Sequence, residues 1–556
     1  MSRRRGLTAL LAAVLAFTLS ACAGLPTSGP VNAGIEADSD AAPPNISFIP
    51  DRPQPGASPV QIVDGFLRAG SGPTDNWATA REYLAPGTEW NPADSVTIDV
   101  FGTRVTRELD DDTVSVLVRQ IARVDDKGAY SAADGGTTDL TFELAQAPDG
   151  EWRITAAPDG ILLDRTRFAD VFHRYPLAYF DPTWTYLVPD VRWFAPSNAA
   201  SRIADALVNK PPSDWLAASV RSSFPEGVTT RPAVPVSAGV ASVSLSQEAA
   251  AVDQSTLDRM QTQLEESLGA AGISSVQMLV ADAELPAEAV TTRRTTVTGG
   301  PLVRTADGFG FLAADQLTEI PGLSAAVAAV DSIAVQVSAD RTAAAVQTSS
   351  RVERVLATGE APSVVDARDD LVAPSIDPQG VVWTVPRANP QAVQAQLADG
   401  RSVTVGDAWP GATQIAAMAV SRDGTRVAAL VTAGGRTAIW VSGIVRGRDQ
   451  LPSVLGTPFE LGLAAGSGRS LAWLDDETVG VVTDDGEASI VYEQTVGGPG
   501  AATSGPAGAT SIAGGATIAT MRIRSSEGNL YVRRGSNWQE TATGILVLAT
   551  QQGMPE

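Results

Sequence analysis

The side chains with the widest chemical range are scarce in this chain of 556 residues. It has one histidine (His173), one cysteine (Cys22) and two lysines (Lys127 and Lys210). That set excludes a disulfide framework and a zinc site built from cysteine and histidine. A Ser–His–Asp triad would have to use His173, and no G-x-S-x-G motif accompanies it. We therefore expect His173 to be a packed or surface residue, and we predict no catalytic residue, no cofactor and no enzyme activity.

Paired aspartates are the remaining candidates for a metal site. None of the pairs has the spacing of an EF-hand loop, and aspartates at turns more often accept hydrogen bonds from backbone N–H groups. No metal site is therefore predicted. The pairs are Asp111-Asp112, Asp369-Asp370, Asp475-Asp476 and Asp484-Asp485.

Charge and length set further limits. Sixty-three acidic residues against forty basic ones give a net charge of −23, which excludes nucleic acid as a partner because a run of phosphates would not be neutralised. A hydrophobic share of 44% with 19% charged residues is typical of globular protein. The length allows three or four domains.

The first residues predict export and lipidation. Arg3-Arg4-Arg5 precede an apolar run, 6–19, that is too short to span a membrane. The following Leu19-Ser20-Ala21-Cys22 resembles the bacterial lipobox. Residues 1–21 are then a lipoprotein signal peptide that a signal peptidase removes between Ala21 and Cys22.

Lipidation would place an S-diacylglycerol and an N-acyl chain, such as palmitate, on Cys22. We expect a protein anchored by lipid to the cell membrane on its extracytoplasmic face. The alternative is a soluble secreted protein cleaved after Ala23, because Ala21-Cys22-Ala23 also fits an A-x-A site.

Two mixed regions follow a tether. Residues 22–58 are the lipidated N-terminus and a proline-rich linker. Residues 59–190 are predicted to be an α+β domain. Its first helix is capped at Ser58-Pro59, a second helix is expected over Trp77–Leu84, and strands alternate over 114–118 and 140–144.

Residues 191–290 are predicted to be a second α+β domain. Its most regular helix has apolar residues at i, i+3, i+7 and i+11, a spacing typical of core packing. These residues are Leu257, Met260, Leu264 and Leu268.

Residues 291–556 change to short apolar strands separated by turns. Equivalent turns lie between alternating runs, 37 to 52 residues apart, at Asp340, Asp377, Asp423, Asp475 and Gly514. This spacing is typical of four-stranded propeller blades. We predict an all-β propeller of about six blades, with a pair of β-sandwiches as the alternative.

The order of these parts resembles a known family. The lipobox followed by Gly24-Leu25-Pro26-Thr27-Ser28-Gly29-Pro30-Val31 resembles the start of LpqB-type lipoproteins of actinobacteria. Residues 191–290 resemble a GerMN module through Phe224-Pro225-Glu226-Gly227, Val243-Ser244-Leu245-Ser246 and the helix at 257–268. Ser244 stands where the family usually has an acidic residue. The last third resembles the LpqB β-propeller.

The resemblance implies a membrane-anchored accessory protein of a sensor histidine kinase. The implied partner is the extracytoplasmic domain of an MtrB-like kinase in MtrA–MtrB signalling, which serves cell-envelope homeostasis. Two alternatives remain from other classes. One is a binder of cell-wall glycan or peptide, and the other is an envelope hydrolase with two carboxylates in a propeller channel.

Overall fold

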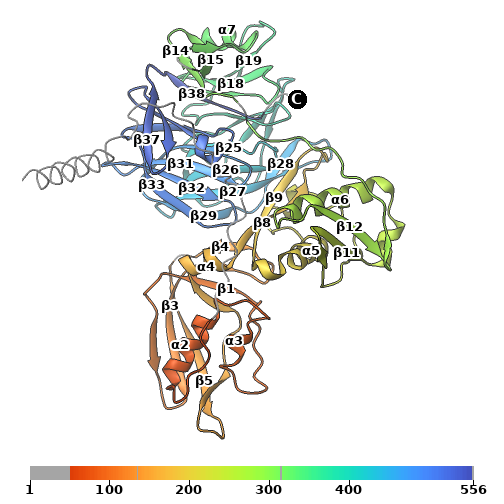
Figure 1. The fold of residues 1–556 in the computed structure, drawn as a ribbon. Coiled ribbons are helices and arrows are strands. Elements are labelled where there is room, and N and C mark those ends of the chain that lie inside the picture. The colour runs from red at the N-terminus through yellow and green to blue at the C-terminus, as the bar shows by residue number, and fades with distance from the viewer. Residues whose placement is uncertain (1–49, 134, 298, 314–315, 554–556) are drawn as a thin grey trace, which may run out of the picture. The chain divides into compact units, whose positions relative to one another are not determined.

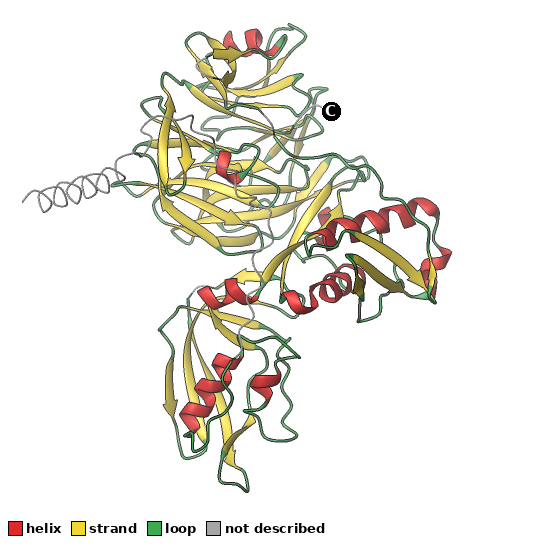
Figure 2. Ribbon diagram, viewed as in Figure 1, coloured by secondary structure: helices red, strands yellow, loops and turns green. Residues whose placement is uncertain are grey.

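The computed structural model describes residues 50–133, 135–297, 299–313 and 316–553. Cys22 and the predicted signal peptide lie outside these residues, so cleavage after Ala21 and lipidation remain predictions. Two regions of mixed helix and sheet precede a region built almost entirely of strands (Figure 1; Figure 2). This confirms the predicted multidomain class, two α+β domains followed by an all-β propeller.

The first region begins with helix α2 (Pro59–Ala69), which starts where the sequence predicts. Ser58 and Gln61 form a capping box, in which the Ser58 N–H donates to Gln61 Oε1 at 2.9 Å. Val63 and Leu67 are buried on the inner face of the helix.

The predicted second helix is shorter than expected. Helix α3 covers only Ala78–Arg81, because Trp77 has a left-handed backbone with φ 57° that a right-handed helix does not accept. Leu84 instead forms an isolated β-bridge with Ile154.

A seven-stranded sheet completes this region. The path β6-β5-β3-β1-β7 forms its main part, and β2 and β4 also pair with β3. In the register, Val114 lies opposite Phe142, so the two predicted alternating strands are neighbours. Phe66 of α2 packs on Phe142 with ring centroids 6.0 Å apart. The elements are β1 (Val96–Asp99), β2 (Val105–Glu108), β3 (Thr113–Val124), β4 (Tyr130–Ala132), β5 (Thr137–Gln146), β6 (Trp152–Ala156), β7 (Ile161–Asp164) and α4 (Arg165–Val171).

The second region packs two helices against a hairpin and a small sheet. Strands β11 and β12 are parallel and are connected through α6. The predicted apolar residues of α6 are all buried, three of them completely. The elements are β8 (His173–Phe180), β9 (Leu187–Phe194), η2 (Pro196–Asn198), α5 (Ala199–Asn209), η3 (Ala217–Ser219), β10 (Val236–Ser237), β11 (Val240–Leu245), η4 (Gln247–Ala251), α6 (Gln254–Gly269), β12 (Ser275–Val280) and β13 (Ala283–Glu284).

Buried polar side chains of α6 hold the hairpin strand β8. Gln263 is fully buried, donates to the Ala178 carbonyl at 2.7 Å and accepts from the Ser223 N–H at 2.5 Å. Ser267 Oγ accepts from the Ala178 N–H at 2.9 Å. The hairpin thus packs with the second region, and the predicted boundary between residues 190 and 191 falls inside β9.

The described residues from 302 to 551 form six blades, of which five have four strands and blade 4 has five. Blade 1 consists of β38, β14, β15 and β16, and blades 2 to 6 follow in chain order. The early elements are β14 (Leu302–Thr305), β15 (Gly308–Ala313), β16 (Gln316–Thr318), α7 (Leu323–Ala328), β17 (Ala334–Val337), β18 (Ala343–Gln347), β19 (Val352–Leu356), β20 (Ser363–Asp366), β21 (Ser375–Ile376), β22 (Val382–Thr384), β23 (Gln394–Gln396) and β24 (Ser402–Thr404).

Blade 4 is the largest, because β29 also pairs with its third strand, β27. The later elements are β25 (Ala412–Val420), β26 (Arg426–Ala433), β27 (Arg436–Arg446), β28 (Pro452–Leu455), β29 (Phe459–Ala464), β30 (Ser467–Trp473), β31 (Thr478–Asp484), β32 (Ser489–Thr495), β33 (Gly500–Ser504), β34 (Ala509–Ala513), η5 (Ile518–Thr520), β35 (Arg522–Ser525), β36 (Leu530–Arg534), β37 (Asn537–Ala542) and β38 (Val547–Gln551).

Each predicted turn connects the first and second strands of one blade, from blade 2 to blade 6. In four of them the Asp carboxylate accepts a hydrogen bond from the N–H two residues further on, at 2.8 to 3.1 Å. These are Asp340, Asp377, Asp423 and Asp475. The predicted repeat of about six blades is confirmed, and the alternative pair of β-sandwiches is wrong.

Candidate functional site

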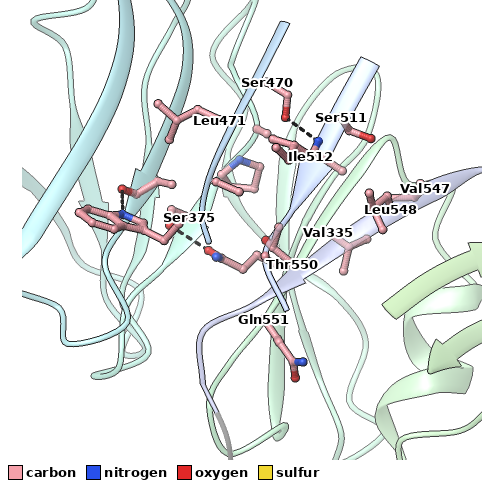
Figure 3. A pocket seen from close by; sticks show the side chains of 18 of the residues that line it. Val335, Ser375, Ser470, Leu471, Ser511, Ile512, Val547, Leu548, Thr550 and Gln551 are labelled. Atoms are coloured by element: carbon pink, nitrogen blue, oxygen red, sulfur yellow. Dashed lines mark hydrogen bonds between the residues drawn. The ribbon is translucent and has the colours of Figure 1, made fainter. Parts of the chain in front are cut away.

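The first strands of the six blades surround a cavity of about 220 Å³ (Figure 3). They are β38, β17, β21, β25, β30 and β34. Aliphatic and hydroxyl side chains alternate around the cavity, as Val335, Leu471 and Leu548 stand among Ser375, Ser511 and Thr550. The cavity lies on the axis of the propeller because each blade contributes its innermost strand.

The cavity is closed where the first strands end. Arg422 is 7% exposed and donates to the carbonyls of Trp473 and Leu474, both at 3.2 Å. Burial lowers the pKa of the Arg422 guanidinium, against the opposing effect of nearby aspartates. Gln552 is 1% exposed and donates to the Ser421 carbonyl at 2.6 Å. These side chains plug this end of the channel.

Polar groups of the wall link neighbouring blades. Ser375 Oγ donates to Gln336 Oε1 at 2.8 Å and accepts from the Val420 N–H at 3.0 Å, which joins blades 2, 3 and 4. Ser470 Oγ accepts from the Ile512 N–H at 3.2 Å, between blades 5 and 6. The wall is therefore held in place by its own hydrogen bonds.

The open end has a different composition. Ile333 and Leu546 directly precede the first strands of blades 2 and 1, and their side chains are 58% and 48% exposed. Arg524, on β35, donates to the Ile545 carbonyl at 2.7 Å and to Thr510 Oγ1 at 3.2 Å. Burial lowers the pKa of Arg524. We call Ile333, Leu546, Arg524 and Thr510 the channel mouth.

Among the described residues that line the cavity there is neither Asp nor Glu. A glycoside hydrolase of the expected type needs two carboxylates beside its substrate. This cavity therefore lacks the groups required by the hydrolase alternative, and what it offers is hydrogen bonding, apolar contact and a guanidinium group.

The residues with the widest chemical range do not come together in one site. His173 lies half-buried in β8, and burial lowers its pKa, which disfavours the imidazolium form. Within the described residues its imidazole forms neither a hydrogen bond nor an ion pair. Lys210 pairs with Asp126 at 3.6 Å and with Asp205 at 3.8 Å.

The aspartate pairs act locally in the structure. Asp475 accepts from the N–H groups of Glu477 and Thr478, and Asp485 accepts from those of Glu487 and Ala488. In the described part of the chain, groups of three or more His, Cys, Asp or Glu residues arranged to hold a metal ion do not occur. Ser244, which stands where the family usually has an acidic residue, lies in β11. Its backbone carbonyl accepts a hydrogen bond from the Arg231 N–H at 3.0 Å.

The sequence alone does not identify the residues of the channel mouth. Its residues come from blades 1, 2 and 6, and the apolar residue just before a first strand is recognisable only when the strand starts are known. Arg524 lies on a second strand and had no distinguishing signal.

The fold and this cavity define a multidomain protein whose C-terminal domain is a six-bladed β-propeller with a central cavity. Three family models match consecutive parts of the chain. They are "Lipoprotein LpqB, N-terminal domain" over residues 52–169, "Sporulation and spore germination" (Germane) over 176–286, and "Lipoprotein LpqB beta-propeller domain" over 300–547. The chain belongs to the LpqB family of lipoproteins.

Relatives named Lipoprotein LpqB agree with this assignment. The Rhodococcus opacus (strain B4) protein is 30% identical over 300 residues, which are 51% of this chain and 49% of the relative. The match thus spans about half the length of that relative. The proteins of Mycolicibacterium smegmatis and Mycobacterium tuberculosis are 27% identical over 88% of this chain, and over 88% and 89% of their own lengths.

The family name implies a lipid-modified protein anchored to a membrane of the cell envelope. None of the helices formed by described residues is long and apolar enough to cross a bilayer.

Proposed function

We propose that this lipoprotein is a regulatory binding protein of a sensor histidine kinase. In this proposal Cys22 carries the lipid, the body stands on the extracytoplasmic face of the cell membrane, and the partner is the extracytoplasmic domain of an MtrB-like kinase. The protein acts by contact and catalyses no reaction.

One observation carries the proposal. The central cavity of the propeller has no carboxylate among its described lining residues, and its wall residues Ser375 and Ser470 are hydrogen-bonded to neighbouring blades. A wall of this kind is preorganised for contact, whereas acid–base chemistry needs a titratable group beside the substrate. His173, the one imidazole, lies on β8 in the second region.

Confinement to one membrane supports a partner in the same membrane. Two proteins held at the same surface meet at a high effective concentration, so a weak contact is sufficient. The net charge of −23 makes such binding sensitive to salt where the partner surface is basic.

The test uses the full-length lipoprotein and the full-length kinase reconstituted together in vesicles. We expect the kinase to co-purify with the lipoprotein and its autophosphorylation rate to change several-fold when the lipoprotein is present. His173→Ala should behave like the wild type, and neither form should release soluble fragments from purified cell wall. An autophosphorylation rate that is the same with and without the lipoprotein would overturn the proposal. Cell-wall hydrolysis that His173→Ala abolishes would also overturn it.

A further inference from the structure

The channel mouth exposes aliphatic surface beside a cavity. Of the four large apolar side chains that are exposed in the described part of the propeller, Ile333 and Leu546 line the same cavity. The other two, Val364 and Leu463, lie on the outer strands β20 and β29. Exposed aliphatic groups at the rim of a pocket favour contact with apolar groups of a ligand.

Arg524 lacks the carboxylate partner that the ion-paired arginines Arg426 and Arg446 have. Arg426 pairs with Asp423 at 2.5 Å, and Arg446 pairs with Asp377 at 2.8 Å. Arg524 is half-buried, the described residues give it no carboxylate within ion-pair distance, and only two of its three nitrogens have a hydrogen-bond partner. The Nη2 group of Arg524 is thus available to an acceptor from outside.

The charge and the volume of the cavity limit the kinds of ligand that it can bind. The lining contains two arginines and, among described residues, no acid, in a protein whose net charge is −23. A guanidinium group binds a carboxylate through paired hydrogen bonds. The volume of about 220 Å³ is below the range of roughly 300–1,000 Å³ that holds a whole drug-sized ligand. It accommodates one or two side chains of a larger molecule.

We propose that the channel mouth binds a peptide segment of a protein partner, with an Asp or Glu carboxylate on Arg524 and aliphatic neighbours on Ile333 and Leu546. In an extended segment, side chains two positions apart lie on the same face, so a Leu-x-Glu-x-Leu spacing would present these groups together. The proposed contact involves the propeller alone and its test contains no kinase, so its failure and the failure of the proposed function are distinguishable.

The test is calorimetric titration of the full-length lipoprotein in detergent with acetyl-Leu-Ala-Glu-Ala-Leu-amide and the matched acetyl-Leu-Ala-Gln-Ala-Leu-amide. The wild type should bind the Glu peptide about tenfold more tightly, as expected for one charge-assisted hydrogen-bonded pair. Arg524→Gln should remove this preference. Arg401→Gln is the matched control, because Arg401 is exposed and pairs with Asp399, and it should keep the preference.

Two further variants separate binding from folding. Arg524→Lys retains the charge and should retain part of the preference even where Arg524→Gln loosens the contact with Ile545. Ile333→Ser should weaken both peptides alike, because it removes apolar contact without changing charge. Equal affinity of the wild type for both peptides, absence of binding at millimolar peptide, or a preference unchanged in folded Arg524→Gln would each overturn the proposal. So would binding of free 4-methylpentanoate as tight as that of the Glu peptide, because the site would then be one for a small free acid.

Discussion

Val303 of β14 lies opposite Leu548 of β38, although 245 positions of sequence separate the two residues. Both side chains are buried. β38 also pairs in parallel with β17, the first strand of blade 2. The last strand of the chain therefore completes the first blade and closes the propeller.

Removing that strand tests the closure. Ending the chain after Gly544 deletes β38 and exposes the apolar edges of blades 1 and 2, because each blade of a ring needs two neighbours. We expect the Tm of the propeller to fall on the order of 10 °C, since several kcal/mol are lost at about 2–4 °C per kcal/mol. Differential scanning calorimetry measures the change. A chain ending after Gly553 keeps β38 and serves as the control, and equal Tm values for both would show that the ring does not depend on β38.

The sequence predicted the repeat because its signal is local. Asp377 and Asp423 each accept from an N–H two residues further on, so the turn is specified within a few positions. Blade 1 gives no such signal, since its first strand comes from the end of the chain and its second from residue 302.

The central cavity could not be predicted because its residues are far apart in the sequence. Its wall combines one short strand from each of six blades, and neither Arg524 nor Ile333 has a neighbour in sequence that marks a role. The predicted boundary between residues 190 and 191 falls inside β9, and the hairpin is attached to α6 through Gln263 and Ser267, polar residues about 85 positions away that no local pattern marks.

Breaking the ion pair of Asp423 and Arg426 should cause a large loss of stability. The side chains are 1% and 0% exposed and lie 2.5 Å apart. Asp423→Asn would leave the buried Arg426 guanidinium without its ion-pair partner, at a cost of about 3–5 kcal/mol. Asp399→Asn removes an exposed pair and should cost far less. Denaturant unfolding at pH 7 compares the two, and equal losses would contradict the assignment.

The pH dependence of this pair follows from the pKa of Asp423. Burial acts to raise that pKa, but the Arg426 charge and hydrogen bonds from Thr425 and Arg426 hold it below its ordinary value. A lowered pKa adds stability that is present above the unfolded pKa, about 3.9, and is lost as the pH falls through the folded pKa. The difference between wild type and Asp423→Asn should therefore be constant above about pH 5 and shrink in stronger acid.

Cys22→Ser tests the anchor that the sequence predicts. A serine cannot accept the thioether-linked lipid, so the protein should leave the membrane fraction or accumulate as the uncleaved precursor. Fractionation and the mass of the N-terminal peptide measure both. A cleaved wild-type protein that stays with the membrane but has no lipid mass on Cys22 would show that another feature holds it there.

We expect the contribution of Asp476 to stability to depend on pH in the opposite direction to that of Asp423. Burial raises the pKa of Asp476, and a hydrogen bond from Thr295 Oγ1 to Asp476 Oδ2 only partly opposes it. A raised folded pKa means that the neutral form is favoured in the native state, so stability is lost as the pH rises above the unfolded pKa of about 3.9. Asp476→Asn is neutral at every pH and keeps an oxygen for Thr295, so it should have the higher Tm at pH 7, by a few degrees.

The gain from Asp476→Asn should disappear near pH 4, where the wild-type carboxyl is protonated in the folded protein. Asp475→Asn is the matched control in the same turn, because the Asp475 carboxylate accepts from the N–H groups of Glu477 and Thr478. Removing that acceptor charge should lower the Tm or leave it unchanged. Thermal unfolding of the three proteins at pH 4 and pH 7 decides the matter. A lower Tm for Asp476→Asn at pH 7 would mean that the ionised carboxylate stabilises the propeller, through Arg422 and Arg426, more than its burial costs.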